Sequence, residues 1–151
     1  MLKMKGENGG MGINLHAGFS YLITRHSTYR EFENKTCLML GVQDIGFDRR
    51  AFLNATEAVG FEINPYFTSM RQSNRDEFNS YELFNMLGFS AVSAMDISDY
   101  EGAGILHDLN RPVPKELYSK FDLIYDGGTM EHVYDAPMVM ENIGNMLNVG
   151  G

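Results

Sequence analysis

Acidic side chains stand at or near the ends of three short apolar runs in the sequence. Asp96 closes AVSAMD, Asp108 lies near the end of GILHDLN, and Asp126 closes FDLIYD. Short apolar runs that alternate with helical segments are typical of a parallel sheet, in which ligands bind across the carboxyl ends of the strands. We therefore expect the three carboxylates to share one rim of a sheet with Gly41, which follows the apolar run TCLML.

A second group of reactive side chains follows Asp126 in the stretch FDLIYDGGTMEHV. The Gly-Gly pair allows the chain to turn tightly at the end of the strand, and Glu131 and His132 come shortly after it. A histidine can act as a general base because its pKa lies near neutrality. A structural role for His132, in which it caps or packs the helix turn, is left open. Neither Glu131 and His132 nor His107 and Asp108 have the spacing of helical metal ligands, so we expect no metal site.

The loop after the first apolar run limits which cofactors fit. Gly41, Gln43 and Gly46 keep the spacing of the dinucleotide motif G-x-G-x-x-G, with glutamine in place of the middle glycine. That glycine lets the backbone approach a pyrophosphate, so a glutamine side chain there would obstruct NAD or FAD. An NAD-dependent Rossmann oxidoreductase is therefore the less favoured hypothesis for this sequence.

The elements that must position these residues are predicted from apolar periodicity and from start and stop signals. Strands are expected over residues 36–40, 91–96, 104–108 and 121–126. Helices are expected over residues 17–33, 48–59 and 74–87, the last from a capping-box pattern of Ser73 and Asp76. A final helix starts at Asp135, and its buried stripe is formed by Val139, Ile143, Met146 and Leu147. These elements predict an α/β fold, an open parallel sheet with flanking helices, over residues 17–151 after a flexible segment over residues 1–16.

The composition of the chain indicates which cellular compartment and which classes of partner to expect. The formal net charge of -8 and the lack of a Lys/Arg cluster argue against a nucleic-acid partner, because such binding depends on basic side chains. Cys37 is the single cysteine, so no internal disulfide can form, as is usual in a reducing compartment. No apolar stretch approaches the roughly 18 residues of a membrane span, and the first residues do not form a signal peptide. We expect a cytoplasmic protein with no membrane partner.

Several motifs together resemble class I S-adenosylmethionine-dependent methyltransferases. They are LGVQDIG, the strand end at Asp96, HDLNRPVP, FDLIYDGGTMEHV and the closing MLNVGG, and the resemblance runs over residues 36–151. The link SDYEGAGILHDLNRPVP resembles that of a bacterial subgroup with small-molecule or glycan-associated acceptors. The resemblance implies a Rossmann-like fold, S-adenosylmethionine as the cofactor, and a small-molecule or glycan-precursor acceptor.

The resemblance also implies a role for each site residue. Gly41 and Gln43 would lie beside the methionine part of the cofactor, although the family commonly has a second glycine where this chain has Gln43, and an acidic residue where it has Met39. Asp96 would bind the ribose hydroxyls, with Glu62 of VGFEINP as the alternative. The implied residues around the adenine and the reacting methyl group are Asp108 and Leu109 for the adenine, Asp126 and Gly127 near the sulfonium, and Glu131 and His132 on the acceptor wall. A second possibility for Asp108 is that it caps the turn before Pro112.

The sequence supplies fewer strands than the family arrangement, which orders seven strands as 3-2-1-4-5-7-6. Only the first four are predicted here, so the C-terminal strands of the fold are expected to be missing and the fourth strand to expose an edge. We therefore expect either a fragment or a chain that pairs with another copy or a partner chain. A non-catalytic remnant or partner subunit is the alternative to an active methyltransferase.

Overall fold

The computed structural model of the protein describes residues 32–58, 60 and 79–151. Several predictions lie outside these residues. They are the flexible segment 1–16, nearly all of the helix over 17–33, the ribose-binding alternative Glu62, and the capping pair Ser73 and Asp76.

In the part of the chain that the structure describes, four parallel strands form one sheet in the order β3-β2-β1-β4. The strands are β1 (Thr36–Leu40), β2 (Ala91–Asp96), β3 (Ile105–Leu106) and β4 (Leu123–Asp126). Strand β1 pairs with β2 on one side, from Thr36 opposite Ala91 to Leu40 opposite Met95. On its other side β1 pairs with β4, where Leu40 lies opposite Asp126. The α/β fold with a parallel sheet is thus confirmed, and its order equals that expected for the first four strands.

The third strand is shorter than predicted. It ends at Leu106, and His107 N still donates to Asp96 O at 2.8 Å. Asp108 then turns the chain, because its Oδ1 accepts hydrogen bonds from the Asn110 amide at 3.0 Å and from Asn110 Nδ2 at 2.8 Å. Local side-chain bonds of this kind compete with strand pairing.

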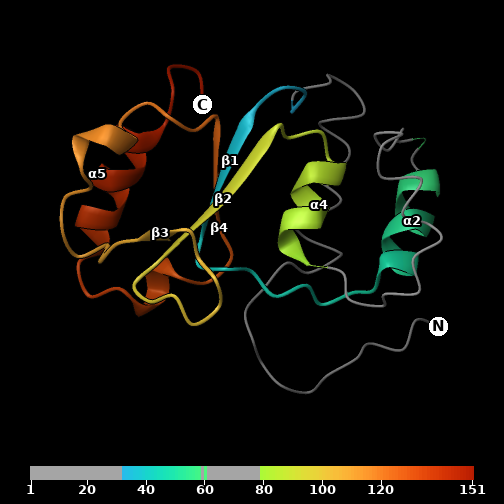
Figure 1. The fold of residues 1–151 in the computed structure, drawn as a ribbon, viewed down its shortest axis with the longest axis horizontal. Coiled ribbons are helices and arrows are strands. Elements are labelled where there is room, and N and C mark those ends of the chain that lie inside the picture. Colours follow the sequence, from blue (N-terminus) through green and yellow to red (C-terminus); the bar gives the residue numbers. More distant parts are fainter. Residues whose placement is uncertain (1–31, 59, 61–78) are drawn as a thin grey trace.

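Helices cover both faces of the sheet (Figure 1). Helix α5 (Ala136–Met146) lies on one side, and α4 (Ser80–Met86) and α2 (Arg49–Ala58) lie on the other. Successive residues of a strand point to opposite faces. Leu38 and Leu40 of β1 therefore pack in the cluster that contains α5, whereas Cys37 and Met39 pack in the cluster that contains α4 and α2. Burial on both faces explains why β1 reads as a continuous apolar run.

Helix α4 begins later than predicted. Asn79 has an extended backbone, with φ −114° and ψ 166°, and its side chain accepts a hydrogen bond from Glu82 N at 2.9 Å. Glu82 Oε2 in turn lies 3.5 Å from Asn79 N, which completes a capping box. The prediction of one continuous helix over 74–87 is therefore wrong at Asn79. A second capping-box pattern stood six residues further along the chain than the one that was chosen.

The other helices agree with their predicted starts. Asp48 Oδ1 accepts from Ala51 N at 2.7 Å ahead of α2, and Asp135 Oδ1 accepts from Met138 N at 3.0 Å at the start of α5. Val139 and Met146 are fully buried on α5, and Ile143 packs against the same cluster. The helix also buries Asn142, a polar residue that the apolar stripe did not predict.

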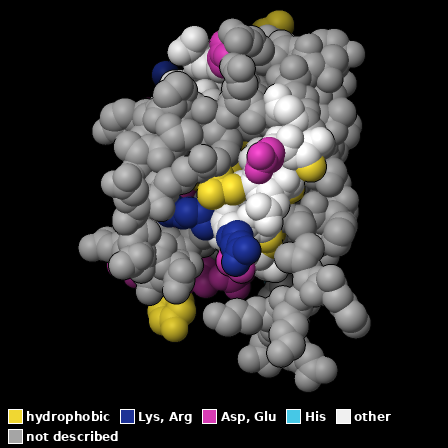
Figure 2. Space-filling model, turned by 90° about the vertical axis from the view of Figure 1, so that its right-hand side faces the viewer, with side chains coloured by type: hydrophobic (Ala, Val, Ile, Leu, Met, Phe, Trp, Pro, Cys, Tyr) yellow, Lys and Arg dark blue, Asp and Glu magenta, His cyan; other side chains and the backbone are white. Residues whose placement is uncertain are grey.

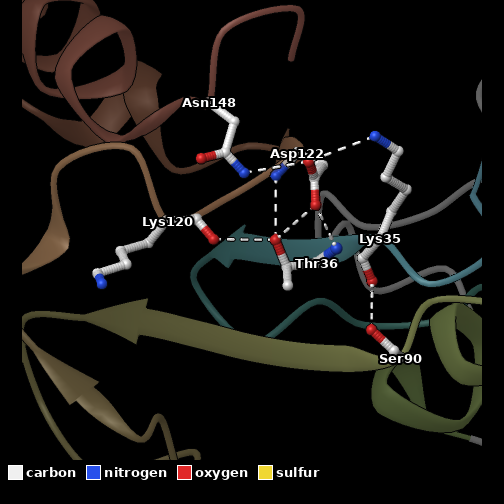
Figure 3. A network of polar contacts seen from close by, with 6 residues as sticks. All are labelled: Lys35, Thr36, Ser90, Lys120, Asp122 and Asn148. Atoms are coloured by element: carbon white, nitrogen blue, oxygen red, sulfur yellow. Dashed lines mark hydrogen bonds and ion pairs between the residues drawn. The ribbon is translucent and has the colours of Figure 1, made fainter.

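A carboxylate joins the amino ends of β1 and β4 (Figure 3). The Thr36 amide donates to Asp122 Oδ2 at 2.8 Å, and Asn148 Nδ2 donates to Asp122 Oδ1 at 3.0 Å. Lys35 Nζ lies 3.6 Å from the same carboxylate. The backbone hydrogen bond from Thr36, with smaller contributions from these neighbours, lowers the pKa of Asp122. Hydrogen bonds and an ion pair thus link β1 to β4 at the amino ends of the strands.

The outer side of β4 forms one edge of the sheet. In the described part of the chain, the pairing on that side is a single parallel bridge between Phe121 and Leu147. Asn148 N donates to Phe121 O at 2.8 Å at this bridge. Within the described ranges, residues 123–126 pair with β1 alone, which leaves backbone donors and acceptors on the outer side of β4.

The surface on the α2 side of the molecule carries both acidic and basic side chains among its described residues (Figure 2). One pair of opposite charges connects two helices, since Arg49 Nη2 of α2 lies 3.1 Å from Glu82 Oε2 of α4. No helix within the described ranges is long and apolar enough to cross a membrane.

Candidate functional site

A cavity of about 290 Å³ opens at the carboxyl ends of β2, β3 and β4. The loops that follow these three strands supply its walls. Its lining residues are Met95, Asp96, Ile97, His107, Asp108, Leu109, Asn110, Gly128, Thr129, His132 and Val133. This volume is at the lower end of small-molecule sites, which start at about 300 Å³. The cavity therefore has the size for a small organic group.

Asp96 presents an available carboxylate oxygen to this cavity. Its Oδ1 accepts a hydrogen bond from Ser98 N at 3.1 Å, and its Oδ2 accepts none from any described residue. That Oδ2 atom points toward β1, because a Cβ built on Gly41 would lie 3.8 Å from it. The structure thus leaves Asp96 able to accept hydrogen bonds from a ligand, at the edge of the cavity nearest to Gly41.

Asp108 both shapes its own turn and lines the cavity. Hydrogen bonds from the Asn110 side chain and backbone, with a smaller contribution from Arg111, hold the pKa of Asp108 below its ordinary value. Arg111 Nε lies 3.6 Å from Asp108 Oδ2. The capping role that was left open for Asp108 is therefore present in the structure, and the ionised carboxylate still faces the cavity. Leu109 is buried next to it and provides an apolar wall.

Asn142 of α5 holds the loop that carries Asp108 and Leu109. Its Oδ1 accepts from Val113 N at 2.9 Å, and its Nδ2 donates to Leu109 O at 3.2 Å and to Arg111 O at 2.9 Å. All three bonds join residues that are far apart in sequence, so no local pattern could have identified Asn142. The residue is a positioning residue for the β3 side of the cavity.

Asp126 organises the turn after β4 and does not line the cavity. Its Oδ1 accepts from Gly128 N at 3.0 Å and from Thr129 N at 2.7 Å, and its Oδ2 accepts from Met130 N at 3.1 Å. These bonds fix the short 3-10 helix η4 (Met130–His132). Asp126 therefore acts on the site through the position of Thr129 and His132, which do line the cavity.

His132 stands at the open side of the cavity with 74% of its side chain exposed. Its Nε2 lies 3.8 Å from Glu131 Oε1, and Glu131 itself is not a lining residue. Of the two residues expected on the acceptor wall, the structure places His132 at the cavity and Glu131 behind it.

The ends of β1 and β4 pack against each other through Gly41, Gln43 and Gly127. We call this contact the joint. Gln43 Nε2 donates to Leu40 O at 2.6 Å and to Gly41 O at 3.3 Å. A Cβ on Gly127 would overlap Gln43 Oε1, so only glycine leaves space for the glutamine there. None of these residues lines the cavity. The residues that were expected beside the methionine part and the sulfonium of the cofactor therefore lie outside the lining of this cavity.

Thr129 is a site residue that the sequence reasoning missed. Its hydroxyl donates to Leu40 O at 2.6 Å, which ties the β4 turn to the end of β1. A Cβ on Gly41, whose φ is +74°, would lie 2.7 Å from that hydroxyl, so Gly41 also makes room for Thr129. No local pattern predicts this contact, because Thr129 and Leu40 lie 89 residues apart in the sequence.

The lining of the cavity is acidic and partly apolar. Asp96 and Asp108 supply two carboxylates, Leu109 supplies an apolar wall, and neither lysine nor arginine is among the lining residues. Carboxylates accept hydrogen bonds from hydroxyl and amino groups and attract a positive charge, whereas they repel phosphate oxygens. Among the described residues, no group of three His, Cys, Asp or Glu side chains could hold a metal ion.

Comparison of the chain with known proteins identifies no relative. No family model matches it, and no curated protein or solved structure matches it significantly.

Proposed function

We propose that this chain is a Rossmann-like, S-adenosylmethionine-dependent methyltransferase domain that binds the adenosyl part of its cofactor in the cavity at the strand ends. One observation carries the proposal: Asp96 and Asp108, which follow neighbouring strands, line the same cavity. The strand order β3-β2-β1-β4 supports it, because this order lays a ligand across the ends of β3 and β2 toward β1. The buried free thiol of Cys37 is compatible with a cytoplasmic location.

The chain's own side chains would hold the reactants in fixed positions. Bound S-adenosylmethionine supplies an electrophilic methyl group on a sulfonium. Asp96 Oδ2 would accept hydrogen bonds from the ribose hydroxyls, and Asp108 would accept one from the adenine amino group beside Leu109. The two negative charges also favour a cationic ligand over a neutral one. Holding two reactants in line provides much of the rate enhancement in a displacement of this kind.

His132 would manage the proton of the acceptor. A hydroxyl or amine of a small molecule or glycan precursor loses a proton when it is methylated, and a neutral His132 ring nitrogen can accept that proton at the open side of the cavity. The carboxylate of Glu131 lies 3.8 Å from the Nε2 atom of His132. Asp126 contributes indirectly, because it fixes the turn that carries His132.

Isothermal titration calorimetry with S-adenosylhomocysteine tests the proposal. We expect binding to the full chain, and a loss of about tenfold or more in affinity in Asp96→Ala, because charge-assisted hydrogen bonds are removed. Asp99→Ala is the matched control, since Asp99 lies on the same loop, is exposed and does not line the cavity. The absence of binding heat from folded protein, or equal affinities of Asp96→Ala and Asp99→Ala, would overturn the proposal.

A second candidate is a non-catalytic remnant or partner subunit that keeps the sheet without turnover. Two observations favour it: the Gln43 side chain is buried and bound to the Leu40 carbonyl, and the outer side of β4 is unpaired from Leu123 to Asp126 in the described chain. A partner chain could then add a strand at this edge. This candidate predicts weak or no cofactor binding together with a stable complex in gel filtration.

An NAD-dependent oxidoreductase is the third candidate and has the weakest support. Gln43 replaces the glycine that would approach a pyrophosphate, and the cavity is lined by carboxylates. A rise in melting temperature with NAD and not with S-adenosylhomocysteine would favour this candidate over the first.

A further inference from the structure

The Gln43 side chain is buried in an unfavourable arrangement. Only 7% of the residue is exposed, and its Nε2 is paired twice with backbone carbonyls. Its Oε1, however, has no hydrogen-bond partner among the described residues. A buried acceptor without a partner destabilises the conformation that holds it. The buried conformation of the Gln43 side chain is therefore stabilised by two hydrogen bonds of Nε2 and destabilised by the unpaired Oε1.

The position of Gln43 corresponds to one particular end of a bound nucleoside. In the strand order β3-β2-β1, Asp108 and Leu109 follow β3, Asp96 follows β2, and Gln43 follows β1. Asp96 Oδ2 points toward Gly41, and Gln43 Nε2 would lie 3.5 Å from a Cβ on Gly41. A nucleoside with its base at Asp108 and its ribose at Asp96 therefore directs its 5′ substituent toward Gln43.

We propose that Gln43 is a specificity-determining gate that closes the 5′ end of the adenosyl site. This inference rests on the proposed function. With Gln43 in its buried position, the cavity accepts an adenosine with a small 5′ group. A ligand that also carries an amino-acid chain binds only after the Gln43 amide leaves Leu40 O and Gly41 O. Because Oε1 gains partners on leaving, the gate opens at a small cost, about the value of one net hydrogen bond or a factor of about ten in affinity.

Two ligands that share one half test the gate. 5′-Deoxy-5′-methylthioadenosine has the adenosine and sulfur of S-adenosylhomocysteine but lacks the amino-acid chain. We expect calorimetry on the full chain to show that Gln43→Ala raises the affinity for S-adenosylhomocysteine about tenfold and leaves that for methylthioadenosine unchanged within about twofold. Gln43→Ser is a second variant with the same expectation, because its short side chain also leaves the space beside Gly127 empty. Circular dichroism establishes that each variant is folded.

Val42→Ala is the control for general loosening of the loop. Val42 precedes Gln43, packs in the cluster that contains α4 and α2, and is not among the atoms that a Cβ on Gly127 would meet. If Val42→Ala raises the affinity for S-adenosylhomocysteine as much as Gln43→Ala does, or if Gln43→Ala raises neither affinity or both equally, the gate is refuted.

The outcomes separate the gate from the proposed function. Binding of S-adenosylhomocysteine that depends on Asp96 but not on Gln43 refutes the gate and leaves the function standing. No binding of either nucleoside to the wild-type chain or to Gln43→Ala refutes both.

Discussion

The joint between Gln43 and Gly127 makes a quantitative prediction about stability. A methyl group on Gly127 would overlap Gln43 Oε1 and would lie 2.9 Å from Tyr125 Cε1. The φ of Gly127 is not positive, so alanine is compatible with its backbone and the cost is steric. We expect Gly127→Ala to lower the free energy of unfolding by about 1–3 kcal/mol, the usual range for overpacking.

The same substitution is expected to behave differently when Gln43 is shortened. In a Gln43→Ala background the main obstacle is gone, and the Tyr125 ring is the remaining contact. The reduced entropy of the unfolded chain then offsets part of the cost by about 0.4–1 kcal/mol. The cost of Gly127→Ala is expected to fall below about 1 kcal/mol, which gives a coupling free energy of about 1–2 kcal/mol between the two positions.

Urea unfolding of the wild type, both single variants and the double variant, followed by far-ultraviolet circular dichroism, measures this coupling. Gly144→Ala is the matched control, because Gly144 lies within α5 and a Cβ there would meet no atom within 4 Å. That variant should gain up to about 1 kcal/mol in a manner additive with Gln43→Ala. A coupling below about 0.5 kcal/mol for Gly127 and Gln43 would mean that the two residues do not touch and would refute the reasoning.

Three further predictions concern the stability of the sheet and of α5. The Thr36 amide lowers the pKa of Asp122 in the folded state, so this carboxylate stabilises the fold above the ordinary carboxyl pKa of about 3.9, and the stabilisation is lost as pH falls through the lower folded pKa. Asp122→Asn should therefore reduce the loss of unfolding free energy at acid pH, measured by urea titrations at a series of pH values. An unchanged loss in the variant would contradict this prediction. Burial raises the pKa of the Cys37 thiol, so a thiol reagent at pH 8 should react only as fast as the protein unfolds, whereas immediate labelling of native protein would show that the strand is accessible. Asp135→Ala should lower the free energy of unfolding by about 1 kcal/mol through loss of the bond from Met138 N, and Asp135→Asn should retain most of it; equal losses would exclude capping as the cause.

The parts of the fold that depend on local sequence could be predicted. Strand β1 is continuously apolar because helices cover both of its faces, and α5 begins at Asp135 because an aspartate followed by proline is a strong start signal. The start of α4 was placed wrongly because Ser73 and Asn79 offered similar capping patterns, and the sequence does not show which one the surrounding structure uses.

The candidate site was predictable only to the level of which strand ends carry it. Asp96, Asp108, Leu109 and His132 meet at one cavity, as expected from the rule that parallel strands share a rim. The direction of the Gln43 side chain could not be predicted, because it depends on the space left by Gly127, which follows a different strand from Gln43. Thr129 illustrates the same limit, since its hydroxyl binds a carbonyl 89 positions earlier in the chain.

The cross-strand network of Asp122, Thr36 and Asn148 lies at the amino ends of β1 and β4, whereas the cavity lies at the carboxyl ends of the sheet. The loops that line the cavity can therefore change in evolution without any change to the network at the amino ends of the strands. A library randomised in those loops should yield many variants with new ligand preferences and an unchanged secondary-structure content. A library randomised at Thr36, Asp122 and Asn148 should yield mostly unfolded chains.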